Sequence, residues 1–471
     1  MKTKLIILVL FCLVTLSSCK KWLDVQPKTQ VESSANFETV NGFKDALTGV
    51  YVNMTTPALY GKELSFGFVD VIGKNYTQFR SSHDYYQDAQ YNYLAANTRA
   101  RIDNIWMGSY NTIANINNLI ANLNTVDKGM FTGSDYQIIR GEAYGLRAFN
   151  HFDLLRLFAP SPAAAGLAAK AIPYRTEFKP DNVVQSTVGQ VLDQIIADLQ
   201  VASDMLRPVD PIVAGSTVVV PIGGYLRDRP YKFNYYAVRA LLARVYLYKG
   251  DKANALICAK EVIASAKFPF TIVSQIIGGN GIFSTEVIFN LNINTLQAAN
   301  DIAFSETAPV GMYFTSSEWS SLYEISSGGS ADYRYVYTTK DIGDFRYTQK
   351  INPVKNTLPI AANRLPLIRM SEMYYIAAES SLDTDPSAAI GYMNTIRTSR
   401  NLANLAANLT PAAVQTEILK EYRKDFLCEG QLFYYYKRLN LPSITFTQVV
   451  ADNKVYVLPV PDSEKEFGNI Q

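Results

Sequence analysis

The chain has 471 residues, of which 48% are hydrophobic and 18% charged, a composition typical of a globular protein rather than a disordered one. The 44 basic and 42 acidic residues nearly cancel, and no basic run is longer than Lys20-Lys21, which argues against nucleic-acid binding. His83 and His151 are the only histidines, so we do not expect a histidine-based metal site or catalytic triad.

The first 18 residues have the pattern of a secretory signal peptide. Lys2 and Lys4 precede an apolar run at 5–16 that is too short to span a bilayer. The run ends in Leu16-Ser17-Ser18-Cys19, which matches a bacterial lipobox. We therefore predict cleavage before Cys19 and acylation of this cysteine; the alternative is an ordinary signal peptide in which the cysteine is accidental. Stable anchoring needs several acyl chains, because burial contributes only about 0.8 kcal/mol per CH₂.

Hydrophobic residues recur at helical spacing along most of the chain after a polar tether at 19–36. Long aperiodic segments at 57–100 and 268–360 predict surface loops, with one strand at 286–291. The segment 209–230 predicts loop with a short strand, and 456–461 predicts extended chain before its prolines. The predicted helices cover 43–51, 102–123, 136–158, 191–206, 235–249, 251–266, 366–381, 386–399 and 411–428.

The helix pair at 235–266 has the spacing of a tetratricopeptide repeat. Small residues fall where two helices would touch, and Gly250 falls at the turn between them. The segment 368–397 is a looser second copy, and 140–157 opens a further unit; a generic helical hairpin is the alternative for each. Such units must stack to bury their apolar faces. The sequence therefore predicts a mainly α protein, an α/α superhelix of tetratricopeptide-like hairpins with long irregular loops, a few short strands and a single compact body.

Several motifs, taken in order, resemble the SusD/RagB family of outer-membrane lipoproteins of Bacteroidetes. They are Cys19 with KKWLDVQP, RGEAYGLRAFNHFDLLRLFAPSP, the repeat pair, LPLIRMSEMYYIAAES, EYRKDFLCEGQLFYYYKRLN and VLPVPDSE. Tyr422, Leu432 and Tyr435 depart from the family pattern, which has two arginines and an aspartate there. The resemblance divides the chain into a signal peptide at 1–18, a lipidated tether at 19–36, an N-terminal helical region with ligand loops at 37–230, a helix pair at 231–270 and a C-terminal region at 271–471.

The resemblance implies a non-catalytic lipoprotein on the outer membrane, facing the exterior and held only by its lipid. Such proteins capture an oligosaccharide, or in some members a peptide, and deliver it to a TonB-dependent transporter of the SusC type. Two alternatives stay open: a helical scaffold or transporter lid that binds only protein, and an extracellular glycosidase, because 42 acidic residues always contain candidate carboxylate pairs. No cofactor is expected; the Asp-rich loops leave room for a structural Ca²⁺ ion, although no EF-hand spacing supports one.

Tyrosines and planar polar residues concentrate in the two aperiodic segments. Sugars present flat C–H faces and hydroxyl groups, which proteins meet with aromatic rings and with Asn, Asp or Arg side chains. Functional residues usually lie on loops that a rigid scaffold positions. We therefore predict ligand contacts from Asp70, Asn75, Tyr76, Arg80, Tyr85, Tyr86, Tyr91, Tyr313, Trp319 and Tyr323, and His83 is a further candidate.

Other conspicuous residues are interpreted as structural. Trp106 and His151 lie on apolar helices and are predicted to be core residues. Cys258 and Cys428 are interpreted as buried free thiols, although sequence alone does not exclude a disulfide. Charged residues on the packed helices are predicted to form buried ion pairs, since an unpaired buried charge is poorly tolerated; they are Arg140, Glu142, Arg147, Glu372, Glu379, Glu421, Arg423 and Glu429.

Overall fold

The computed structural model describes residues 36–181, 183–213, 215, 216, 218, 220, 224–304 and 311–468. The predicted signal peptide, Cys19 and the tether up to residue 35 lie outside this range, as does much of the short strand predicted within 209–230.

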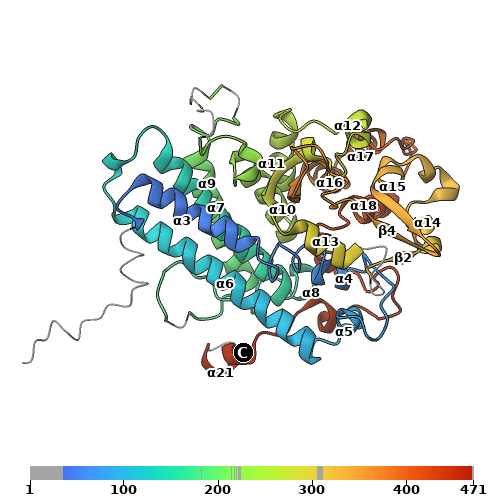
Figure 1. Ribbon diagram of the computed structural model, residues 1–471, viewed down its shortest axis with the longest axis horizontal. Coiled ribbons are helices and arrows are strands. Elements are labelled where there is room, and N and C mark those ends of the chain that lie inside the picture. The colour runs from blue at the N-terminus through green and yellow to red at the C-terminus, as the bar shows by residue number, and fades with distance from the viewer. Residues whose placement is uncertain are drawn as a thin grey trace, which may run out of the picture.

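Long helices stacked side by side form the body of the protein (Figure 1). Packing runs from α3 to α6, α7, α9, α10, α11, α16 and α17, so that helices adjacent in the chain form hairpins and each hairpin packs on the next. This arrangement confirms the predicted stack of tetratricopeptide-like hairpins. The helices are α3 (Val40–Met54), α6 (Ala96–Thr125), α7 (Asp135–Phe158), α9 (Val188–Leu206), α10 (Tyr235–Lys249), α11 (Lys252–Ala264), α16 (Met370–Ser381), α17 (Pro386–Ser399) and α18 (Pro411–Asp425).

The repeat pair α10–α11 shows how local sequence sets these boundaries. The Asn234 side chain accepts a hydrogen bond from the Ala237 amide (3.0 Å) and caps the start of α10. Gly250 ends the helix with a φ of 91°, a left-handed conformation that glycine adopts at little cost. Asp251 then caps α11 through the Asn254 amide (3.0 Å), so the turn predicted from the repeat spacing is confirmed.

Two small sheets occupy the segment from 287 to 369. The predicted strand at 286–291 is confirmed as β1 (Val287–Asn292), which pairs antiparallel with β5 (Arg364–Arg369). The helix predicted to begin at 366 is wrong at its start, because residues up to Arg369 complete this ladder before α16 begins. A three-stranded sheet was missed, since its strands are too short to show periodicity; it consists of β2 (Phe314–Thr315), β4 (Phe345–Thr348) and β3 (Thr339–Ile342).

Much of the predicted surface loop at 57–100 is buried. Phe66, Phe68 and Val69 have no exposed surface and pack into the main core. Side chains form hydrogen bonds with backbone groups that no helix or strand pairs there. The Glu63 carboxylate, for example, accepts a hydrogen bond from the Phe68 amide (3.0 Å). The short elements between the long helices are α4 (Phe68–Ile72), α5 (Tyr86–Ala89), α8 (Pro162–Ala165), α12 (Val273–Ile277), α13 (Leu296–Phe304), α14 (Ser316–Leu322), α15 (Tyr333–Thr338), α19 (Leu432–Arg438), α20 (Asn453–Tyr456) and α21 (Asp462–Phe467).

The residues predicted to be structural are mostly confirmed. Trp106 is 1% exposed, His151 is fully buried, and Cys258 and Cys428 are buried free thiols. Arg140 donates a hydrogen bond to Asn124 (2.7 Å) and Arg423 lies over the Phe446 ring, so within the described residues neither forms the predicted ion pair. The other predicted pairs form: Glu142–Arg229, Arg147–Asp198, Glu372–Arg244, Glu379–Arg438, Glu421–Arg334 and Glu429–Lys350, at 2.5–2.7 Å.

The three departures from the family pattern lie in the core. Tyr422, Leu432 and Tyr435 are all buried, and the two tyrosine rings lie 4.7 Å apart. Aromatic packing therefore occupies positions where the family pattern has charged residues.

Within the described residues, no helix combines the length and the apolar character that crossing a bilayer requires.

Candidate ligand-binding surface

The two aperiodic segments predicted to hold the ligand residues lie side by side. The amides of Thr77 and Gln78 donate hydrogen bonds to the Tyr313 carbonyl (3.0 and 3.1 Å), and the Thr77 hydroxyl donates to Glu318 (2.7 Å). These contacts bring the region of α4 and α5 against β2 and α14, at one end of the helical stack (Figure 1). Residues more than 200 positions apart in the sequence therefore form one surface.

Asp70 lies beneath this surface rather than on it. Its carboxylate is 1% exposed and accepts hydrogen bonds from the amides of Cys428 (2.7 Å) and Gly430 (3.0 Å), from Asn75 (2.9 Å) and from the Tyr76 hydroxyl (3.3 Å). Burial raises the pKa of Asp70 to about 7, and these donors oppose that rise because they favour the carboxylate. The predicted ligand residues Asp70, Asn75 and Tyr76 thus hold the chain together at this point and present no surface to a ligand.

Tyr85 and Tyr91 also serve to position the loop. The Tyr85 hydroxyl donates a hydrogen bond to Glu63 (2.8 Å), and the Arg101 guanidinium lies over its ring at 4.4 Å. Tyr85 is 3% exposed, so its ring is part of the core. Tyr91 is half-buried and donates a hydrogen bond to the Ile72 carbonyl (3.0 Å), which ties α5 back to α4.

Trp319 and Tyr323 stack on one another inside the C-terminal part of the surface. Their ring centroids lie 5.2 Å apart with an interplanar angle of 20°, and each residue is 1% exposed. The Trp319 indole N–H donates to the Arg346 carbonyl (2.6 Å) and so fastens α14 to β4. Neither ring has a free face for a sugar, because α14 turns its apolar side toward the core.

Arg80, Tyr86 and Tyr313 are the predicted ligand residues that remain accessible. Arg80 is exposed, whereas Tyr86 and Tyr313 are half-buried. The Tyr313 ring stacks on the partly exposed Phe345 ring at 6.1 Å.

A depression lined by His83 and by the accessible Tyr86 lies in this region, and we call it the His83 hollow. It consists of two parts, of about 460 and 270 Å³, that share Ser82, His83 and Asp84. One part reaches Tyr86 and Gln87 and the first residues of α6, and the other reaches Lys62 and Met312.

Hydrogen bonds and ion pairs fix the walls of the His83 hollow. His83 Nδ1 accepts a hydrogen bond from the Tyr85 amide (3.0 Å), and its ring packs edge-on against Phe79 at 4.9 Å. Asp84 pairs with Arg101 (2.6 Å). The hollow is therefore preformed, as binding sites for small molecules usually are.

Three residues of this lining could not be predicted from the sequence. Lys62, Asp84 and Met312 carry no periodicity or motif that would have singled them out, and they meet only in the folded chain. Composition drew attention to this region, since exposed polar residues and tyrosines gather there, but it did not separate rings that face solvent from rings that face the core.

The hollow offers aromatic edges, an imidazole, an ammonium and one carboxylate, groups that suit reversible binding of a hydroxyl-rich molecule. Across the described residues, no three His, Cys, Asp or Glu side chains are grouped as metal ligands. The stacked hairpins and the preformed hollow together define a helical binding protein.

Comparisons with known proteins agree with this class. A family model described as "Starch-binding associating with outer membrane" matches residues 21–247, and the SusD family model matches residues 287–465. SusD-like protein P2 of Formosa agariphila is 24% identical over 96% of this chain and 95% of its own length. The chain belongs to the SusD/RagB family, whose members associate with the outer membrane and bind carbohydrate without catalysing a reaction.

Solved structures show the same fold. A SusD superfamily protein from Bacteroides thetaiotaomicron superposes with a TM-score of 0.74 at 23% identity, covering 92% of this chain and 99% of that one. A laminarin-binding SusD-like protein superposes with a TM-score of 0.64 at 19% identity, covering 92% of this chain and 98% of that one.

We expect Trp319→Ala to destabilise the fold rather than to remove a ligand contact. Loss of a buried, hydrogen-bonded indole should lower the free energy of unfolding by about 3–5 kcal/mol. Tyr86→Ala, at a half-buried ring beside the hollow, should lower it by only about 1 kcal/mol. Urea denaturation followed by circular dichroism measures both, and a Trp319→Ala protein as stable as Tyr86→Ala would show that the indole is not a core residue.

Proposed function

We propose that the protein captures an oligosaccharide in the His83 hollow at the cell surface and delivers it to a TonB-dependent transporter of the SusC type. The observation that carries the proposal is the hollow itself: a preformed depression beside accessible aromatic rings, in a chain that belongs to a family of carbohydrate-binding proteins.

The side chains around the hollow suit the chemistry of sugars. The half-buried Tyr86 ring offers an apolar face to the C–H side of a pyranose, and Gln87 offers a donor and an acceptor to its hydroxyl groups. Lys62 and Asp84 both line the hollow and carry opposite charges. The surface therefore favours a neutral, hydroxyl-rich chain over a strongly charged one.

Titration calorimetry against malto- and laminari-oligosaccharides tests the binding step. We expect heat of binding with the natural protein and at least an approximately tenfold loss of affinity in Tyr86→Ala, since a ring that contacts ligand contributes about 1.4 kcal/mol or more. Tyr337→Ala removes an exposed ring that lines neither part of the hollow, and it should bind as the natural protein does. Equal affinities for the two variants would contradict the proposed site, and no binding of any glycan in a broader panel would contradict the function.

We further propose that acyl chains on Cys19 hold the protein on the outer face of the outer membrane, with Lys20 next to the anchor. The lipobox at 16–19 and the association of the family with the outer membrane support this arrangement. The lipid keeps the helical part of the protein next to the transporter, to which it delivers the ligand.

Cys19→Ala should release the protein from the membrane. We expect the natural protein to partition into the detergent phase of a Triton X-114 extract. The variant, expressed without the apolar run at 5–16, should remain in the aqueous phase, because a chain that lacks both acyl groups and that run has no apolar anchor. Mass spectrometry of the amino-terminal peptide is the accompanying control. An unmodified Cys19 in the natural protein would overturn the anchor.

A further inference from the structure

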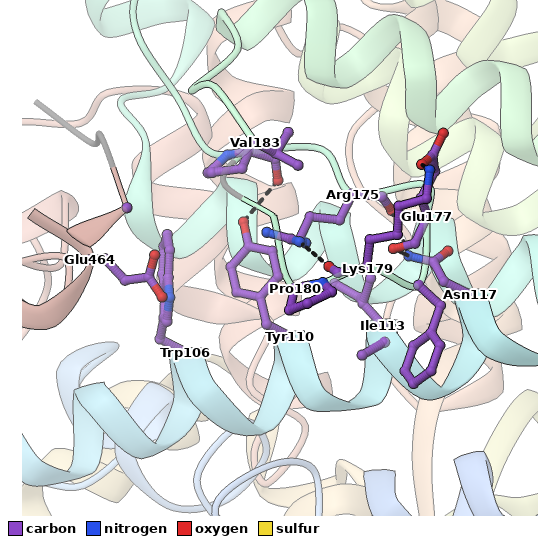
Figure 2. Close-up of a pocket in the computed structure, with 14 residues that line it drawn as sticks. Trp106, Tyr110, Ile113, Asn117, Arg175, Glu177, Lys179, Pro180, Val183 and Glu464 are labelled. Carbon is purple, nitrogen blue, oxygen red and sulfur yellow. Dashed lines mark hydrogen bonds and ion pairs between the residues drawn. The ribbon is translucent and has the colours of Figure 1, made fainter. Parts of the chain in front are cut away.

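A second cavity, of about 510 Å³, lies along α6 (Figure 2). Its first lining residue on this helix is Trp106, whereas the His83 hollow reaches only Asn97. We call it the Trp106 cavity. Segment 173–181, named here the strap, crosses above α6 and covers it, and α21 closes one end. Its lining includes Trp106, Tyr110 and Ala114 on α6, Phe178 and Pro180 on the strap, and Glu464 on α21.

The strap is held in place by its own hydrogen bonds. The Arg175 guanidinium donates to the carbonyls of Lys179 and Asp181 (2.8 Å each) and so closes the strap into a loop. The Arg175 amide donates to His151 Nε2 (3.0 Å). Burial lowers the pKa of His151 to about 3, so the ring stays neutral at ordinary pH and Nε2 remains an acceptor.

Helices α6 and α7 anchor the strap from below. The Tyr110 hydroxyl donates to the Pro173 carbonyl (2.8 Å), and the Asn117 amide donates to the Arg175 carbonyl (3.0 Å). Arg147 in turn donates to the Asn117 side chain (3.1 Å), which fixes the orientation of that amide. The space between strap and α6 is therefore built into the fold and does not depend on a bound molecule.

The lining combines apolar faces with balanced charge. Tyr110, Pro180 and Phe178 supply the apolar wall, and Phe178 is 55% exposed at the rim. Arg175 and Lys179 are matched by Glu177 and Glu464, and Lys179 pairs with Glu177 at 2.5 Å. An anion or a cation would meet like charge as well as opposite charge, whereas a hydroxyl group both donates and accepts and suits both kinds of partner.

We propose that the Trp106 cavity is a second binding site for a neutral sugar unit, separate from the His83 hollow. The class of ligand rests on the proposed function. The site itself rests on the shape and lining of the cavity, which has no residue in common with the His83 hollow. A chain captured at both sites would gain affinity from the linkage, because the second contact becomes intramolecular.

The test begins from a protein whose His83 hollow has been disabled by His83→Ala and Tyr86→Ala. Saturation-transfer NMR with malto- and laminari-oligosaccharides should still give a signal from this protein, from ligand in the Trp106 cavity. Adding Ala114→Trp, which fills the cavity, should abolish the residual signal. Adding Ala121→Trp, the same change at an exposed position of α6 outside the cavity, should leave it intact.

The outcomes separate this inference from the proposed function. Loss of all signal in the starting double variant, with binding intact in the natural protein, overturns the second site and leaves the first. Signal that survives Ala114→Trp also overturns it, and absence of binding in the natural protein overturns both proposals. If Ala114→Trp fails to fold, Phe178→Ala at the exposed rim replaces it, with an expected loss of most of the residual signal.

Discussion

The structure depends on one buried carboxylate that joins α4 to the turn that follows α18. The carboxylate of Asp70, on α4, accepts hydrogen bonds from the backbone amides of Cys428 and Gly430 in that turn. Gly430 has a φ of 66°, and a Cβ there would lie 2.4 Å from the Leu64 carbonyl, so only glycine allows the two backbones to approach this closely. Glu429, between the two amides, pairs with Lys350 (2.5 Å) and Arg369 (2.9 Å) and extends the junction to β5.

This junction explains how an irregular region can carry the candidate binding surface. A segment without long helices becomes ordered only when its buried contacts offset the conformational entropy that it loses. Here Asp70, Tyr85 and Trp319 fasten the loops from beneath, and Arg80, Tyr86 and Tyr313 are left at the surface. A surface fixed before ligand arrives avoids the free-energy cost of ordering it during binding.

The sequence predicted the helical stack well because each long helix carries its own periodic signal. Gly250 marked the turn between α10 and α11, which the structure confirms, and α11 begins one residue after its predicted start. The burial of loop residues could not be predicted because it depends on partners that are distant in the sequence. Asp70 is buried against the turn at 428–430, hundreds of positions away, and Trp319 is held by the Arg346 carbonyl, tens of positions away. A tyrosine that faces solvent and one that faces the core look alike in sequence, so the region of the candidate site was predictable and its individual contacts were not.

Hydrogen exchange measured by mass spectrometry tests most directly whether this junction holds the binding surface rigid. The account predicts that the amides of 68–76 and of 428–430 exchange nearly as slowly as those of α7, and that Asp70→Asn accelerates exchange in both segments while α7 stays protected. Exchange of both segments within seconds in the natural protein, or no change on Asp70→Asn, would contradict it.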